Sequence, residues 1–328
     1  MMVRLPVALL AVALCARPVI SAAQSPALGF GRVDPLVWSG QISRADSLLF
    51  AASSRAPRDP VTRATLGRWL LARGAIKPGT VLLEEARYFG GDAAVLARAL
   101  APAYARAGEY RALVGLQSSP LSAGERKRAE SLLNAPPSST IGDSTTVALV
   151  ATEGEGLGAV VLRVGDVSLT ARIDARARGL VLDTAWRSRA GVEAFPEPTS
   201  RPIAGVARRA AIGGLVLTRT PVQFEPTGSA VDARLGLDVL APYRPTFNAK
   251  EGVLVLRRPV SMREARSLGV AWPLLETSAG WMVVPPRDSL RLLGSAKARA
   301  AFGGRAWTLE AARGSVTVVY AREPLSRQ

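Results

Sequence analysis

Residues 160–192 read VVLRVGDVSLTARIDARARGLVLDTAWRSRAGV, and this stretch decides how we interpret the chain. Apolar and polar residues alternate up to Ile173, which predicts half-buried strands. The last of these strands leads into a polar loop, and Asp174 places a carboxylate at the mouth of that loop. Gly179 breaks the loop, a short apolar strand follows, and Asp183 can then cap a helix.

This layout resembles the active-site segment of retropepsin-like aspartic proteases, in which a strand delivers an Asp-Thr-Gly-Ala loop. Asp174 matches the catalytic Asp of that motif, and Ala177 matches its Ala. Ala175 stands where the family has Thr, and Arg176 stands where it has Gly. The resemblance implies an all-β acid-protease barrel, and it places residues 190–192 at the end of the helix that follows the loop.

A second segment, ARLGLDVL at residues 233–240, is similar to the family's apolar-Gly-x-Asp-x-Leu segment, which lies beside the catalytic loop. The resemblance makes Leu235 and Gly236 supports of the loop, since glycine permits close approach of the backbone. We interpret Asp238 as an ordinary first-turn acid of a short helix. The family resemblance extends over residues 145–258.

In the same family a glycine-containing hairpin, the flap, closes over the substrate. Residues 196–209 are predicted to be rich in loops, with Ile203-Ala204-Gly205-Val206 at their centre. The resemblance therefore makes Ala204, Gly205 and Val206 the flap candidates.

Aspartic proteolysis needs two carboxylates that share one proton across a water molecule. The chain offers one Asp loop of this kind, so an active form would be a homodimer with Asp174 from each subunit, acting on a peptide or protein substrate. Arg176 opposes this reading, because a nearby guanidinium favours the ionised carboxylate. Ala175 lacks the hydroxyl that, by resemblance, joins the two loops. Two hypotheses stay open: an exported aspartic endopeptidase, or a catalytically degenerate scaffold that binds a peptide or protein.

Residues 34–119 are rich in Ala, Leu and Arg at helical spacing and contain an internal repeat. Gly40, Gly74 and Gly108 recur every 34 residues, which is the tetratricopeptide period. The pattern resembles such repeats and predicts two full helical pairs, a partial pair and a further helix at 123–134. Arrays of this kind present a surface to a protein partner, although an inert helical spacer is equally compatible with the pattern.

Residues 1–23 look like a secretory signal, with Arg4, an apolar run at 7–14 and small residues at 21–23. The run is too short to span a bilayer of about 30 Å, so we expect export to the periplasm or the medium after cleavage. The one cysteine, Cys15, would leave with the signal.

The composition excludes several kinds of chemistry. The chain has no histidine, which excludes Ser-His or Cys-His triads and His-ligated zinc, and we expect no metal and no cofactor. The net charge is +16, but arginine is spread along the chain without a basic-aromatic motif, so we expect no nucleic acid partner.

The predicted architecture is multidomain α + β: N-terminal α-helical tetratricopeptide-like repeats, an all-β retropepsin-like barrel and a mainly β C-terminal extension. The predicted boundaries are a signal peptide at 1–23, helical repeats at 24–134, a linker at 135–144, the protease-like domain at 145–258 and an extension of unknown role at 259–328.

Overall fold

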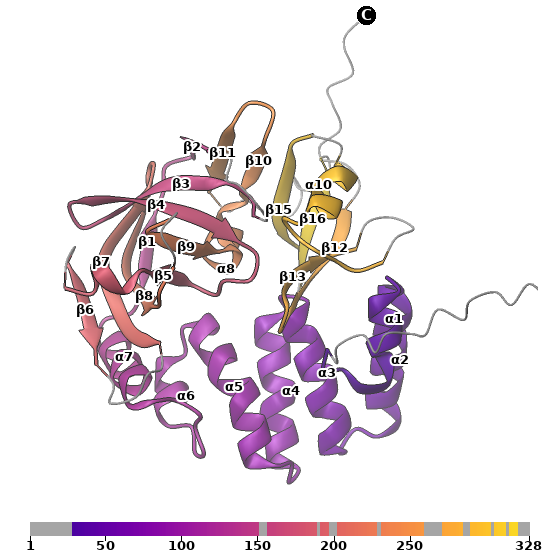
Figure 1. Cartoon of the computed structure of the whole chain (residues 1–328). Helices are drawn as coiled ribbons and strands as arrows, with labels where there is room; N and C mark the ends of the chain where they lie inside the picture. Colours follow the sequence, from indigo (N-terminus) through magenta and orange to yellow (C-terminus); the bar gives the residue numbers. More distant parts are fainter. Residues whose placement is uncertain are drawn as a thin grey trace, which may run out of the picture.

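The computed structural model shows a layer of helices packed against a β-rich region (Figure 1). It describes residues 28–150, 156–188, 191–196, 202–227, 231–258, 271–284, 289–302, 305–312 and 315–320. The predicted signal peptide lies outside the described residues. Within the described ranges, no helix has the length and apolar character needed to cross a membrane.

The N-terminal region consists of short helices that pack side by side in chain order (Figure 1). Asp59 caps one of them by accepting from the amide of Thr62, and Asp92 caps another by accepting from the amides of Ala94 and Val95. The elements are η1 Gly31–Val33, α1 Asp34–Trp38, α2 Ile42–Arg55, α3 Pro60–Ala72, α4 Ile76–Tyr88, α5 Ala93–Ala107, α6 Tyr110–Val114 and α7 Ala123–Asn134.

The three periodic glycines each occupy the turn between two helices. Gly40 joins α1 to α2, Gly74 joins α3 to α4, and Gly108 joins α5 to α6. Their φ angles are +76°, +83° and +73°, a left-handed conformation that glycine adopts without a steric penalty. The predicted helical pairs are therefore present, whereas their identity as tetratricopeptide repeats stays a prediction.

A closed barrel forms the centre of the β-rich region. Its strands are hydrogen-bonded in the order β8-β5-β9-β4-β3-β7, and pairing of β7 with β8 closes the ring. Two further strands attach to this ring: β1 pairs with β8, and β6 pairs with β7. The bounds are β1 Ser138–Thr140, β3 Ala159–Val164, β4 Val167–Asp174, β5 Leu180–Leu182, β6 Val192–Phe195, β7 Ile203–Ile212, β8 Leu215–Phe224 and β9 Ala233–Gly236.

Alternation decides which side chains enter the barrel. Leu169, Ala171 and Ile173 on β4 are buried in the core, while Ser168 and Thr170 are exposed. The predicted strands on either side of the Asp174 loop are thus confirmed as β3, β4 and β5. Among the described residues between Asp183 and the start of β6 at Val192, only η2, Thr184–Trp186, is helical, and Asp183 caps it, so the predicted helix is wrong beyond its first turn.

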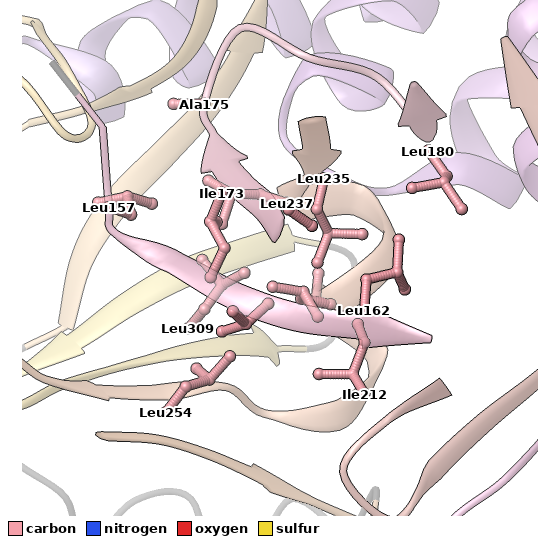
Figure 2. Close-up of a cluster of buried hydrophobic side chains, with 14 of the residues drawn as sticks. Leu157, Leu162, Ile173, Ala175, Leu180, Ile212, Leu235, Leu237, Leu254 and Leu309 are labelled. Carbon is pink, nitrogen blue, oxygen red and sulfur yellow. The ribbon is translucent and has the colours of Figure 1, made fainter. Parts of the chain in front are cut away.

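The predicted linker at 135–144 is wrong in part, because it contains β1, which pairs with β8. The hydrophobic core also continues across the predicted domain boundary at residue 258. Leu254 of the protease-like segment and Leu309 of the predicted extension lie in one hydrophobic cluster (Figure 2).

One further sheet explains this continuity. Its order is β14-β13-β12-β16-β15-β10-β11-β2, so strands from both sides of residue 258 share it. The extension is therefore part of the β-rich fold. The bounds are β2 Ser144–Ala148, β10 Thr246–Asn248, β11 Val253–Arg257, β12 Ala271–Thr277, β13 Gly280–Val283, β14 Arg291–Leu292, β15 Trp307–Ala312 and β16 Ser315–Tyr320, with α8 Leu237–Leu240, η3 Ala241–Tyr243 and α10 Ala296–Phe302.

Candidate active site

Asp174 is the last residue of β4 and opens the loop that leads to β5. Its Oδ1 accepts a hydrogen bond of 2.8 Å from the amide of Arg176, and its carbonyl accepts one of 3.2 Å from the amide of Ala177. The backbone of Arg176 therefore donates to the carboxylate although this position is not glycine.

The loop divides into an inner and an outer side. Ala175 and Ala177 are only 4% and 5% exposed, whereas Arg176 and Arg178 are exposed. Arg176 and Arg178 therefore lie on the outer side of the loop, and Asp174 is half-buried. The side chain of Arg176 does not fill the interior.

Gly236 lies directly beside Asp174. Strand β9 runs between β4 and β5, and the Cα partners across the parallel pair include Ile173 with Leu235 and Asp174 with Gly236. A Cβ at Gly236 would lie 2.4 Å from Oδ1 of Asp238 and 2.7 Å from the carbonyl of Ala177. The close backbone approach expected at this glycine is present, and Leu235 is fully buried beneath the loop.

Asp238 accepts hydrogen bonds from the end of the Asp174 loop. The amide of Gly179 donates to both of its carboxylate oxygens, at 3.0 and 2.9 Å. Burial raises the pKa of Asp238, and the Gly179 amide and the charge of Arg106 oppose that rise. The prediction that Asp238 is an ordinary first-turn acid of a short helix was therefore incomplete. Its side chain also accepts hydrogen bonds from Gly179, at the end of the candidate loop.

The tip of the loop is covered by the turn between β12 and β13. The amide of Trp281 donates to the carbonyl of Ala175 at 2.8 Å. Gly280 has φ +112°, and a Cβ there would lie 2.7 Å from the same carbonyl and 3.1 Å from Cα of Arg176. Part of the predicted extension thus packs on Ala175, the residue where the family has the Thr that joins two subunits.

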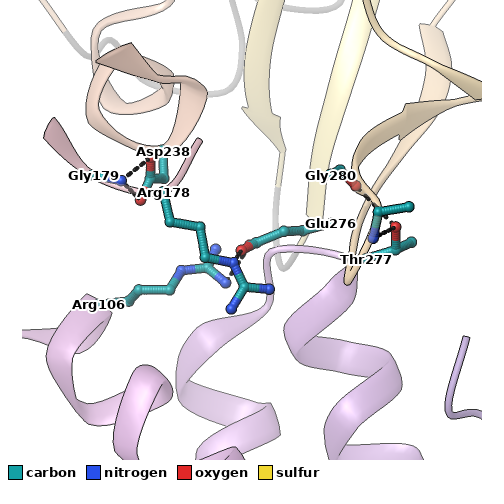
Figure 3. A network of polar contacts seen from close by, with 8 residues as sticks. Arg106, Arg178, Gly179, Asp238, Glu276, Thr277 and Gly280 are labelled. Carbon is teal, nitrogen blue, oxygen red and sulfur yellow. Dashed lines mark hydrogen bonds and ion pairs between the residues drawn. The ribbon is translucent and has the colours of Figure 1, made fainter. Parts of the chain in front are cut away.

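Glu276 brings a second buried carboxylate close to the loop, but with basic partners. It forms ion pairs with Arg106 of α5 and Arg178 of the loop (Figure 3). Burial raises the pKa of Glu276, the two arginines lower it, and Asp238 raises it further. Sequence reasoning missed Glu276, Gly280 and Trp281. The available signal was an acid inside the apolar run Leu274-Leu275-Glu276, because buried acids are rare unless paired.

The flap candidates are placed differently from the prediction. Ala204, Gly205 and Val206 lie in β7, paired with β6 on one side and β8 on the other, and they are buried. Val206 packs into a hydrophobic cluster of the helical region. The prediction of a loop centred on Gly205 is therefore wrong. The β6–β7 connection is at residues 196–202, of which 197–201 lie outside the described residues.

The arrangement offers one oriented carboxylate, Asp174, in a loop whose exposed residues are Arg176 and Arg178. Asp238 and Glu276 are occupied by an amide and by arginines, respectively, so neither is placed as a proton-sharing partner of Asp174. In the described part of the chain, no cluster of three or more acidic, histidine or cysteine side chains is suited to hold a metal ion.

Comparisons with known proteins add little to this geometry. No protein-family model and no curated protein matches the chain. Among solved structures, the chain is similar to a retropepsin-like aspartic protease from Rickettsia conorii, at 15% identity and a TM-score of 0.28. That match covers 37% of this chain and 94% of the other.

Proposed function

We propose that this protein is a catalytically degenerate relative of the retropepsin-like aspartic proteases, in which the barrel and the helical pairs form a scaffold for a peptide or protein partner. The observation that carries the proposal is the cover on the loop tip. The hydrogen bond from Trp281 to Ala175 and the close approach of Gly280 to the backbone of Arg176 cover the loop tip. By family resemblance, a second Asp loop would approach through this surface. The Asp174 of a second subunit could then not come close enough to share a proton with this Asp174.

A specific observation favours a second candidate, an aspartic endopeptidase that acts as a homodimer. The amide of Arg176 still donates to Asp174, so the carboxylate keeps an oriented hydrogen bond. In this case the hairpin would have to leave Ala175 before two Asp174 residues could meet. The substrate would be a peptide or protein in either reading.

Cleavage of a diverse peptide library, read by mass spectrometry from acid to neutral pH, tests the proposal. The wild type, Asp174→Asn and the double variant Ala175→Thr/Arg176→Gly are compared. The scaffold proposal expects no cleavage by the wild type. Cleavage that disappears in Asp174→Asn would overturn it and establish the endopeptidase. Cleavage gained only in the double variant would show that the natural loop is degenerate.

The binding side of the proposal needs its own measurement. Full-length protein is immobilised, a peptide library is passed over it, and retained peptides are identified. We expect retained peptides that are not cut. We also propose export, on the strength of residues 1–23 alone, and N-terminal sequencing of the protein from its native host tests whether the mature chain begins at Gln24.

A further inference from the structure

Three segments that are far apart in the sequence meet at the carboxylate of Glu276. Oε2 lies 2.5 Å from Nη1 of Arg106 in α5, in an ion pair without hydrogen-bond alignment. Oε1 lies 3.2 Å from Nε of Arg178 in the Asp174 loop. The Glu276 side chain is 6% exposed, and Figure 3 shows both guanidinium groups converging on it.

The same rung of the hairpin carries the other contact to the loop. Glu276 on β12 and Trp281 on β13 are Cα partners, and Trp281 donates to the carbonyl of Ala175. This residue pair therefore contacts the loop at two points: Glu276 pairs with Arg178, and Trp281 donates to the carbonyl of Ala175. The turn beyond it is held by Thr277, whose hydroxyl donates to the carbonyl of Gly280 and accepts from the amide of Ala279.

The next rung faces a different part of the molecule. Leu275 and Met282 are Cα partners and belong to a hydrophobic cluster that includes Leu66 and Trp69 of α3. The hairpin base is thus held by apolar packing on the helices, whereas its tip is held over the loop by these polar contacts together with the buried side chain of Trp281. Loss of the polar contacts would loosen the tip while the base stays in place.

We infer that Glu276 is a latch that keeps the β12–β13 hairpin closed over the Asp174 loop and ties this closed state to helix α5. Removing one partner of a buried ion pair leaves an uncompensated charge, which is costly. The burial that raises the pKa of Glu276 is in keeping with a carboxylate that depends on both arginines. The latch does not depend on whether the loop is catalytic.

Hydrogen–deuterium exchange of the full chain tests the latch, with Glu276→Gln as the main variant. We expect exchange to become about tenfold faster in peptides that cover residues 174–180 and 277–283, with peptides of α2 and β3 unchanged. Glu251→Gln, on an exposed turn, is the charge-matched control and should match the wild type. Unchanged exchange in Glu276→Gln, or a uniform increase along the whole chain, would overturn the inference.

Arg178→Met provides a second variant that keeps most of the aliphatic stem of a 57% exposed side chain and leaves Glu276 paired with Arg106. It should also speed exchange in the loop and in the hairpin tip. If the two residues act as one latch, Glu276→Gln/Arg178→Met should exchange no faster than Glu276→Gln alone. Additive increases would mean that they act independently. Because the readout is exchange, a failed latch and a failed functional proposal can be told apart.

Discussion

The amide of Gly179 donates to both carboxylate oxygens of Asp238, across 59 residues of sequence, at 3.0 and 2.9 Å. This bond ties the end of the Asp174 loop to the first turn of α8. The Asp238 side chain is half-buried, so its removal leaves the Gly179 amide without this acceptor.

Asp238→Ala should therefore destabilise the protein by about 2 kcal/mol, because a half-buried amide loses its charged acceptor. The measurement is chemical denaturation followed by tryptophan fluorescence. Asp166→Ala, on the exposed turn between β3 and β4, is the control and should change stability by less than about 0.5 kcal/mol. Equal effects of the two substitutions would contradict the anchoring role of Asp238.

The raised pKa values of Asp238 and Glu276 predict how stability depends on pH. In the folded protein, Asp238 and Glu276 stay protonated at pH values where the same carboxyls in the unfolded chain, with a pKa of about 4, have already lost their protons. The contribution of each group to stability is thus fully present below the unfolded pKa. It is lost as pH rises through the raised folded pKa.

Asp238→Asn isolates one of these contributions, because the amide oxygen can still accept from Gly179 and the group no longer titrates. Denaturation at a series of pH values should show a smaller loss of stability on raising the pH in Asp238→Asn than in the wild type. Asp166→Asn should keep the wild-type profile. Superimposable profiles for the wild type and Asp238→Asn would show that burial does not raise this pKa.

Sequence patterns predicted the parts of the fold that depend on local periodicity. The alternation through Leu169 and Ile173 predicted the strand that delivers Asp174, and the spacing of Gly74 and Gly108 predicted turns between helices. Gly236 was predicted to lie beneath the loop on the strength of family resemblance and the needs of backbone packing.

The remaining features depend on contacts between distant segments, which periodicity does not encode. Glu276 is 102 residues from Asp174, and only tertiary packing puts its carboxylate beside Arg178. The error at Gly205 has a local cause. Small residues and arginines at 204–209 resembled a loop, but pairing of β7 on both sides and cover from the helical region stabilise a strand there.

Gly236→Ala tests the close packing beneath the loop. The added Cβ would lie 2.4 Å from Asp238 and 2.7 Å from the carbonyl of Ala177, so the loop has to move. We expect a loss of about 2 kcal/mol in stability, measured by chemical denaturation. Gly142→Ala is the matched control, because no atom lies within 4 Å of the Cβ that it would gain. The prediction fails if both variants are as stable as the wild type.

Gly79→Ala tests the contact between α3 and α4 in the helical region. Its Cβ would lie 2.8 Å from the carbonyl of Gly67 and 2.8 Å from Cγ of Leu71, because the two helices approach closely at this glycine pair. Alanine favours an isolated helix over glycine by up to about 1 kcal/mol, so a gain in stability is the outcome expected without the steric conflict. We expect a loss of about 2 kcal/mol instead, seen as a lower midpoint in thermal unfolding. Gly115→Ala, whose nearest atom would be 3.4 Å from the new Cβ, should leave the midpoint close to that of the wild type. A higher midpoint for Gly79→Ala than for Gly115→Ala would show that close approach of α3 and α4 does not require a glycine here.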